Sequence, residues 1–363
     1  MRRLLPLHVL LVLTTLCFAA LAAAVDNPPF DPTVCNAFTD GGPLSDPCQQ
    51  MIAAYPTPPV TVTEQDKITL DSFSFWRVGP DPVPEFDAPG GNQISEIPQG
   101  FNFVSAIDLS NPDWIQIEGG KWLRKTDAKF AQPSFFTGVT ISNNLEYPFA
   151  FVLDKSRIFV SAYPGGPRSQ ANGRWLKRYE MVNIFSTAVD KDGWHWYMIG
   201  ANQWVEQRFL SVVKKVDRPE GVSGRWVAVD LYEQTLVAYE DDTPVFATLV
   251  STGLPHHETN TGLFNVWANV TSDPMSGATG APSAYALQRV PWVMYFDGGI
   301  SLHGTYWHDL FGYRQSHGCV NLTISDAHYL YSWFHDGSGD TVQLTNSVYV
   351  YSSGTYGVTA TGI

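Results

Sequence analysis

The sequence predicts a mainly β protein with one short helix close to its C-terminal end. Short runs of alternating apolar and polar residues recur along the chain, and turns that contain Gly and Pro separate them. Aromatic residues are also frequent, at 13% of the 363 residues. Alternation with a period of two is typical of strands buried on one face, and aromatic side chains favour strands. The length is sufficient for two or three domains.

The N-terminal residues have the pattern of a secretory signal peptide. Two arginines follow Met1, an apolar run covers residues 4–22, and small residues precede Val25. This order is typical of an export signal, which we expect over residues 1–24. The protein is therefore expected in the cell envelope, either periplasm or cell wall. Retention of the run as a membrane anchor is the alternative, and the mature chain has no other stretch apolar enough to span a bilayer.

Residues 25–72 are rich in Pro, Asp and Thr, which predicts a lead-in or linker before the first domain. Signal cleavage would leave three cysteines, Cys35, Cys48 and Cys319. An odd number in an exported protein leaves one thiol unpaired. Cys35 and Cys48 lie close together in sequence and can close a small loop as a disulfide, or both can stay reduced.

Residues 73–216 contain a diverged repeat. Segments 113–124 and 193–206 each read as a strand that begins with a Trp, a turn, and a second strand that begins with a Trp. This pattern resembles bacterial SH3-like modules, so we expect one or two small β-barrels here. Trp-lined grooves would let them bind the cell wall or gate an active site; in the alternative, the tryptophans form the barrel cores. These residues are Trp114, Trp122, Trp194 and Trp204.

The region 222–346 predicts a β-rich domain. Alternation of apolar and polar residues indicates strands at 226–231, 235–239, 244–252, 263–268, 292–296 and 300–303, with a last strand at 341–344. A helix is expected over 327–335, because Ser325 and Asp326 can cap its N-terminus and Gly337 can end it.

Two segments of this part are expected to be mobile. Residues 271–284 are full of Gly, Ser, Pro and Ala, which predicts a loop. The tail 347–363 is rich in Gly, Ser and Thr and is expected to be flexible.

The charge balance excludes two classes of partner. Lys and Arg number 22 against 35 Asp and Glu, which gives a formal net charge of −13. The sequence has no run of basic residues, so we expect no binding to nucleic acid and no charge-driven adhesion to anionic lipid.

Residues 316–321, which read Ser-His-Gly-Cys-Val-Asn, carry the chemistry. His303 and Gly304 lie a short way upstream. A thiol attacks carbonyl carbon as thiolate, and a neighbouring imidazole can hold that form near neutral pH. Gly318 lets backbone N–H groups approach the oxygen that becomes negative. These residue types predict acyl transfer through a thioester on Cys319. With no cluster at metal-ligand spacing, we expect neither a metal nor another cofactor.

The motif resembles the signature of the L,D-transpeptidases with a YkuD-type catalytic domain. That signature is a histidine, a gap, then Ser or Thr followed by His-Gly-Cys, a hydrophobic residue, and Asn or Arg. The resemblance extends from about residue 222 to 344 and includes the strand 226–231. Family members often carry a proline before the Thr261-Gly262 turn, where this chain has Asn260. The resemblance implies a β-sandwich or β-rich catalytic domain with a short helix after the cysteine motif.

The resemblance also implies roles for the motif residues. Cys319 would be the nucleophile and His303 the base that holds it as thiolate. The carbonyl of Gly304 would orient the imidazole, since a main-chain acceptor fixes the tautomer without adding charge. The backbone N–H groups of Gly318 and Cys319 are candidates for the oxyanion hole, with His317 as a further contributor.

Four more residues are candidates for substrate binding. We expect Ser316 to brace the loop near His303. Asn321 would contact substrate or fix the turn into the helix. Tyr295 and Arg314 flank the motif in sequence, and Arg314 could bind a stem-peptide carboxylate in a bidentate way or be a surface arginine.

The implied substrate is a peptidoglycan stem tetrapeptide. Cys319 would attack the carbonyl of its third residue and expel the terminal D-alanine. An amine of a neighbouring stem would then give a 3→3 cross-link. Water as acceptor would make the enzyme an L,D-carboxypeptidase, and a protein amine an anchoring enzyme. Carbapenem β-lactams are expected to acylate Cys319. A wall-binding protein without activity is the alternative class.

Overall fold

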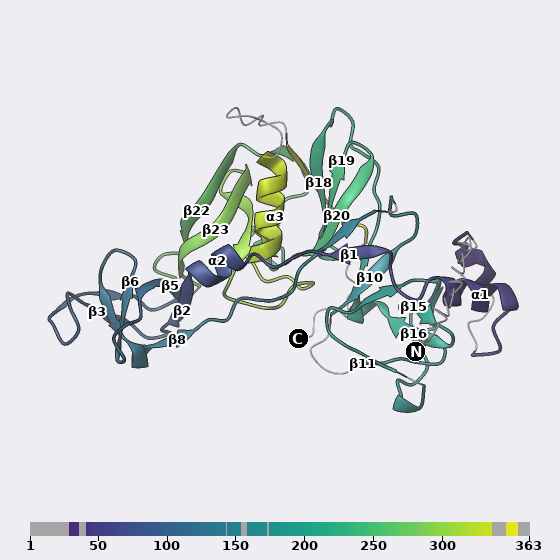
Figure 1. Ribbon diagram of the computed structural model, residues 1–363, viewed down its shortest axis with the longest axis horizontal. Helices are drawn as coiled ribbons and strands as arrows, with labels where there is room; N and C mark the ends of the chain where they lie inside the picture. Colours follow the sequence, from purple (N-terminus) through teal and green to yellow (C-terminus); the bar gives the residue numbers. More distant parts are fainter. Residues whose placement is uncertain are drawn as a thin grey trace, which may run out of the picture.

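The computed structural model describes residues 29–35, 41–142, 144–153, 158–172, 174–281, 283–335 and 346–354. The predicted signal peptide 1–24 and the predicted strand 341–344 lie outside these residues. The described chain is mostly β, as the sequence predicts, with several sheets and few helices (Figure 1). None of the helices among the described residues is long and apolar enough to cross a membrane.

A seven-stranded sheet forms one half of the C-terminal part. Its order is β1 (Val60–Val62), β9 (Val139–Ile141), β20 (Thr243–Leu249), β19 (Thr235–Glu240), β18 (Arg225–Asp230), β26 (Ser347–Tyr351) and β21 (Gly262–Asn265). β26 runs parallel to β18 and antiparallel to β21. The expectation of a flexible tail is therefore wrong for residues 347–351. Val348 and Val350 are buried, so core packing fixes this strand. The Gly, Ser and Thr residues that follow it mask the strand in the sequence pattern.

A second, larger sheet forms the other half and continues into the preceding module. Its main path is β25 (Val320–Thr323), β24 (Ile300–Thr305), β23 (Tyr285–Asp297), β5 (Phe101–Asp108), β6 (Trp114–Ile117), β7 (Trp122–Arg124), β3 (Val83–Phe86) and β4 (Gln93–Ile97). Off this path, β22 (Ala268–Gly277) pairs with β23, and β2 (Ser74–Val78) pairs with β5 and β8 (Ala128–Phe130).

The first half of the expected loop 271–284 is strand, because residues 271–277 belong to β22. β22 and β23 form an antiparallel hairpin. The end of the hairpin is held from outside, because β23 pairs parallel to β5 at Tyr285, Ala286 and Leu287. Pairing with a distant strand overrides the turn-like composition of this segment.

Helix α3 (Ile324–His335) lies between the two sheets (Figure 1). Its residues Ala327, Leu330 and Phe334 enter a core that also contains residues of both sheets, among them Val229 and Leu302. The expected cap differs in detail. The helix begins at Ile324, and the backbone N–H of Asp326 donates to Thr323 Oγ1 at 3.1 Å.

A further group of short β-strands, here called the β module, precedes the C-terminal part in sequence. Its strands are β10 (Phe149–Val152), β11 (Ile158–Phe159), β12 (Trp175–Leu176), β13 (Met181–Asn183), β14 (Ser186–Val189), β15 (His195–Gly200), β16 (Gln203–Glu206) and β17 (Leu210–Val213). Both predicted repeat segments contain an antiparallel strand pair, β6–β7 and β15–β16. Trp204 is fully buried, whereas Trp114, Trp122 and Trp194 are partly buried. The SH3-like character of these modules stays a prediction.

The described part of 25–72 is folded rather than an open linker. It contains α1 (Asp46–Ala54), β1 and α2 (Lys67–Ser72), with 3-10 turns there and elsewhere at Pro32–Cys35, Lys125–Asp127, Gln170–Asn172 and Gln207–Phe209. Cys35 and Cys48 form the expected disulfide. The bridge packs against Trp196 and Trp204 of the β module, which explains why this Pro-rich segment has a fixed place.

Candidate active site

The active-site residues come together on adjacent parallel strands. β24 and β25 pair so that His303 lies opposite Asn321. Alternate residues of a strand point to the same face, so Ser301 and His303 share a face with Cys319 and Asn321. Ser301 Oγ lies 3.8 Å from Cys319 Sγ. The register of two strands thus brings together a serine, a histidine and a cysteine that are separated in sequence.

His303 is held in one tautomer. Its ring is buried, and Nδ1 lies 3.1 Å from the carbonyl oxygen of Gly304. A carbonyl can only accept, so Nδ1 carries the proton and Nε2 is free to accept one. Burial lowers the pKa of His303 to about 4, partly opposed by the Gly304 carbonyl. The ring of Trp307 lies beside it, with 5.6 Å between the ring centroids.

Cys319 is also favoured in its neutral form. Burial raises the pKa of its thiol, and hydrogen bonding by the Ser301 backbone and side chain opposes this rise. The side chain keeps part of its surface exposed. Both partners are therefore neutral at pH 7, because a buried environment disfavours charge on either. The expectation that His303 holds Cys319 as a thiolate stays a prediction, and these pKa directions favour a thiolate that forms during attack.

The motif loop is braced from within. Ser316 Oγ donates to the carbonyl of Cys319 and accepts from the N–H of Gly318 at 3.2 Å. Thr259 Oγ1 donates to the carbonyl of Gly318 at 2.7 Å. Gly318 has φ +119°, which side-chain-bearing residues rarely adopt. Since Ser316 occupies the Gly318 N–H, that group is not available to an oxyanion in this structure, contrary to expectation.

Asn321 belongs to the scaffold behind the nucleophile. It is buried, and its backbone N–H and carbonyl both bond to Ser251. Its side-chain amide lies 3.0 Å from Nε2 of His308. Nδ1 of His308 accepts from the N–H of Leu310 at 3.2 Å. Of the two predicted roles, this placement favours fixing the loop.

Two tyrosines of the β22–β23 hairpin lie near the thiol. Burial raises the pKa of Tyr285, and the negative charge of an ionised Cys319 would raise it further. Tyr295 donates to Asp273 Oδ2 at 2.8 Å and stacks on Trp267. Burial and the bond to Asp273 raise its pKa, with a contribution from Cys319. Tyr295 is therefore near the site, as predicted, but its hydroxyl already has a partner.

His317 lies on the exposed side of the motif. Its ring centroid is 4.4 Å from that of His257 and 5.2 Å from that of Tyr285. Burial of the ring and the charge of His257 lower the pKa of His317. It is therefore favoured as a neutral imidazole.

Arg314 is partly buried next to Glu258. The backbone N–H groups of His256 and Glu258 lower the pKa of the Glu258 carboxyl, and the charges of His256 and Arg314 add to this. The structure thus places Arg314 near the segment that faces the motif loop, without showing a carboxylate partner from a substrate.

Sequence reasoning missed several residues that shape the site. Ser301 could have been found, since it precedes His303 by two positions on a predicted strand. His257, Thr259 and Tyr285 could not, because only the fold brings these distant segments to the motif. Among the described residues no three His, Cys, Asp or Glu side chains are grouped as metal ligands.

The fold and site define a β-rich domain in which a cysteine lies next to the strand that carries a buried histidine. Residues 224–350 match the family model of the L,D-transpeptidase catalytic domain, YkuD. This part of the chain is therefore similar to the L,D-transpeptidase catalytic domain. The match does not extend to the modules before it.

No curated protein matches the chain, but several solved structures are similar to it. An L,D-transpeptidase from Stackebrandtia nassauensis is 28% identical over 39% of this chain and 62% of its own, less than two thirds, with a TM-score of 0.28. The catalytic domain of the E. faecium L,D-transpeptidase is 25% identical over 36% and 99%, with a TM-score of 0.31. The L,D-transpeptidase LdtMt1, solved in complex with imipenem, is 16% identical over 44% and 77%, with a TM-score of 0.32.

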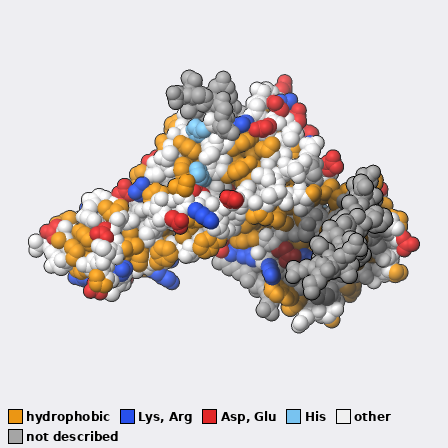
Figure 2. Space-filling view, in the orientation of Figure 1, with side chains coloured by type: hydrophobic (Ala, Val, Ile, Leu, Met, Phe, Trp, Pro, Cys, Tyr) orange, Lys and Arg blue, Asp and Glu red, His pale blue; other side chains and the backbone are white. Residues whose placement is uncertain are grey.

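On the face shown in Figure 2, Lys and Arg side chains lie singly or in small groups among Asp and Glu. This mixed surface agrees with the low content of basic residues.

Proposed function

We propose that the protein is an L,D-transpeptidase that acts on peptidoglycan stem peptides through a thioester on Cys319. The observation that carries the proposal is the position of Cys319 directly before β25, which pairs with the strand of His303. The proton of His303 is held on Nδ1 by the Gly304 carbonyl. An imidazole with Nε2 free can take the proton of a nearby thiol. The family match of this domain supplies the substrate class.

In the first half-reaction the donor is a tetrapeptide stem. As Cys319 Sγ attacks the carbonyl carbon of the third residue, its proton passes to Nε2 of His303. The tetrahedral intermediate collapses, the bond to the terminal D-alanine breaks, and His303 returns the proton to the leaving amine. The product is a thioester and free D-alanine, with no cofactor.

In the second half-reaction an amine of a neighbouring stem attacks the thioester. His303 takes a proton from the attacking amine and gives one to the departing sulfur. The result is a 3→3 cross-link and a regenerated thiol. Water in place of the amine gives a shortened stem and defines an L,D-carboxypeptidase. An amine on an envelope protein defines an anchoring enzyme.

The developing oxyanion needs at least one donor. The N–H of Cys319 is the proposed donor, because Ser316 occupies the neighbouring N–H of Gly318. His317 is the second candidate, since it lies on the exposed side of the loop. Loss of one such donor typically costs about 3 kcal/mol of transition-state stabilisation.

We further propose that the protein is exported through the signal peptide 1–24 and works in the cell envelope. The disulfide between Cys35 and Cys48 supports this, since such bonds persist in oxidising compartments. The modules before the catalytic domain would hold the enzyme against the wall or gate its site.

Carbapenem β-lactams are proposed inhibitors. Attack of Cys319 on the ring carbonyl would open the lactam and leave a covalent adduct. The L,D-transpeptidase LdtMt1, solved in complex with imipenem, is a precedent for such binding. The intact mass of the protein after incubation with imipenem checks this, and an unchanged mass would contradict an accessible, activated thiol.

The main test is mass spectrometry of muropeptides incubated with the mature protein and with its Cys319→Ala variant. Cross-linked dimers that have lost one D-alanine, formed only by the wild type, would support the transpeptidase. Tripeptide monomers alone would identify the carboxypeptidase. Unchanged tetrapeptide would favour the anchoring or the non-catalytic wall-binding alternative.

A further inference from the structure

Asp309 joins the active-site loop to the rest of the molecule. It lies in the segment 306–319 that connects β24 to β25. Its carboxylate accepts from Arg178 Nη1 at 2.7 Å, from Tyr179 hydroxyl at 3.1 Å and from Ser134 Oγ at 2.5 Å. The second guanidinium nitrogen of Arg178 donates to the carbonyl of Asp309. Arg178 thus fixes both the side chain and the main chain of one loop residue.

The geometry of Arg178 is suited to a fixed support. Its side chain is only 15% exposed and lies over the ring of Tyr179, with 4.2 Å between Cζ and the ring centroid. A guanidinium that donates to two acceptors in one plane defines orientation better than a single ammonium. Tyr179 in turn packs against Phe136, with 4.4 Å between ring centroids.

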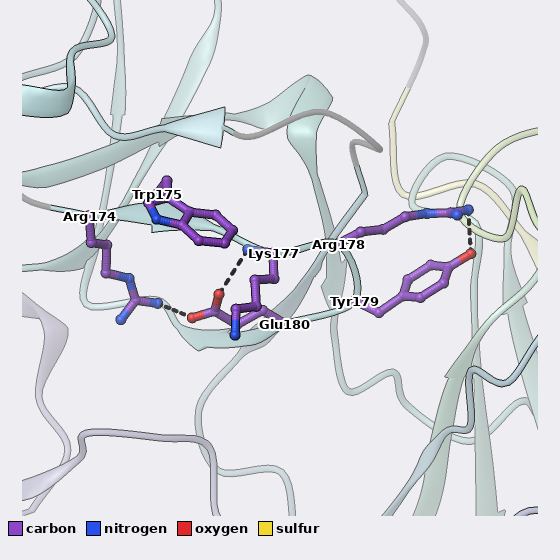
Figure 3. Close-up of a pocket in the computed structure, with 6 residues that line it drawn as sticks. All are labelled: Arg174, Trp175, Lys177, Arg178, Tyr179 and Glu180. Carbon is purple, nitrogen blue, oxygen red and sulfur yellow. Dashed lines mark hydrogen bonds and ion pairs between the residues drawn. The ribbon is translucent and has the colours of Figure 1, made fainter.

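A second arginine of the same segment provides a comparison. Arg174 and Arg178 both line a surface pocket of about 660 Å³. Figure 3 shows Arg174 directed towards Glu180, whereas Arg178 and Tyr179 extend together to the other side. Arg174 has its ion pair within its own module, and Arg178 has its ion pair with the active-site loop.

The residues on either side of Asp309 contact the catalytic strands. Trp307 lies beside His303. His308 meets the side chain of Asn321, which follows the nucleophile by two positions on β25. The carbonyl of Leu310 accepts from Ser251 Oγ at 2.9 Å. A shift of Asp309 would therefore move the groups that contact both the base and the strand of the nucleophile.

We propose that Arg178 is a positioning residue for catalysis, which through Asp309 holds Trp307 against His303 and His308 against Asn321. This inference rests on the proposed function of Cys319 and His303. It assigns a contribution to the reaction to a module that lies outside the matched catalytic domain. A displacement of about 1 Å at a reacting group can lower a rate by as much as a hundredfold, so loss of this support should be measurable.

The test compares Arg178→Met, Arg178→Lys and the matched control Arg174→Met in the full mature chain. The turnover of a tetrapeptide donor gives kcat and KM, and the rate of Cys319 alkylation by iodoacetamide at pH 7 gives thiol reactivity without any substrate. Far-UV circular dichroism and urea unfolding report whether each variant folds.

Arg178→Met is expected to lower kcat about ten- to hundredfold with a smaller change in KM, and to slow alkylation. Arg178→Lys should recover only part of kcat, because an ammonium lacks the planar, fixed pair of donors with which the guanidinium holds both acceptors of Asp309. Arg174→Met should match the wild type. If Arg178→Met does not fold, the kcat and alkylation rate of Arg178→Lys relative to the wild type decide the role of Arg178.

Wild-type kcat and alkylation in Arg178→Met, full rescue by lysine, or an equal loss in Arg174→Met would overturn the inference. A wild type without turnover would count against the proposed function instead. The alkylation rate of Arg178→Met, divided by that of the wild type, would then still decide the role of Arg178.

Discussion

Asp326, on the first turn of α3, accepts a hydrogen bond at 2.8 Å from the backbone N–H of Gly138, 188 residues earlier in the chain. Its other carboxylate oxygen accepts from Thr248 Oγ1 at 2.6 Å. Asp326 is fully buried, and burial raises its pKa to about 6, against the hydrogen bonds that lower it. One carboxyl group thus connects the helix after the nucleophile, the seven-stranded sheet and the segment before β9.

The raised pKa of Asp326 predicts a pH-dependent stability. The folded state binds this proton more tightly than the unfolded state, so the contribution is full below about pH 4 and is lost as pH rises through 6. The loss is on the order of 3 kcal/mol. Asp326→Asn cannot ionise and keeps an oxygen for Gly138. We expect its unfolding free energy, relative to wild type, to rise between pH 4 and pH 7.5 in urea titrations.

Asp326→Ala is the control for this experiment. It leaves Gly138 and Thr248 without their acceptor, so it should be less stable than wild type at both pH values. Parallel pH dependence in wild type and Asp326→Asn would show that Asp326 does not titrate in this range.

The lowered pKa of His303 predicts an unusual activity profile. The imidazole has to be neutral to accept the thiol proton, and its pKa is about 4. The acid limb of kcat/KM should therefore fall near pH 4. Alkylation of Cys319 should reach its maximum only above pH 9, since burial raises the thiol pKa from its ordinary value of 9.0. An acid limb near pH 6.5 would indicate a solvated imidazole.

The backbone of Gly318 predicts a selective loss of activity. A Cβ at φ +119° is strained, and it would also lie 3.4 Å from Ile300 Cδ1. Such strain costs on the order of 1–3 kcal/mol. Gly318→Ala should fold with reduced stability and lose turnover by at least about tenfold, as the motif loop shifts.

Gly221→Ala is the matched control for Gly318→Ala. Gly221 also has a positive φ of +80°, but a Cβ there would meet no atom within 4 Å. We expect a comparable loss of stability and an unchanged kcat. Equal kcat in both variants would show that the loop around Gly318 tolerates the strain.

The Cys35–Cys48 bridge predicts which thiols react. Iodoacetamide without reductant should add one group to the mature protein, at Cys319, and reduction with denaturation should allow two more. The double variant Cys35→Ala/Cys48→Ala should lose about 3 kcal/mol of stability, since the bridge closes a loop with a sequence separation of 13. Turnover should not change. Two or more adducts before reduction would contradict the pairing.

Local pattern predicted those parts of the fold in which short-range signals agree with the tertiary structure. The strands of 226–231 and 300–303 alternate clearly, and the structure has β18 and β24 there. The helix of 327–335 lies inside α3. The motif residues could be proposed from the sequence because His303 and the Ser-His-Gly-Cys run stand in a recognisable order.

The remaining features depend on contacts between distant segments. The composition of 271–284 indicates a loop, but pairing with β5 makes it a hairpin. The hydrogen bond from the Gly318 N–H to Ser316 Oγ follows from loop geometry that no motif encodes. Burial, which favours the neutral forms of His303 and Cys319, is likewise not visible in the motif. The contact between Arg178 and Asp309 joins residues 131 positions apart.

The position of β26 between β18 and β21 governs the order in which the molecule can assemble. A chain that emerges from its N-terminal end exposes Cys319 and His303 before residues 347–351 arrive. Until then the strand that pairs with both β18 and β21 is missing. A chain synthesised only as far as Cys319 therefore carries the motif without the strand that joins β18 to β21.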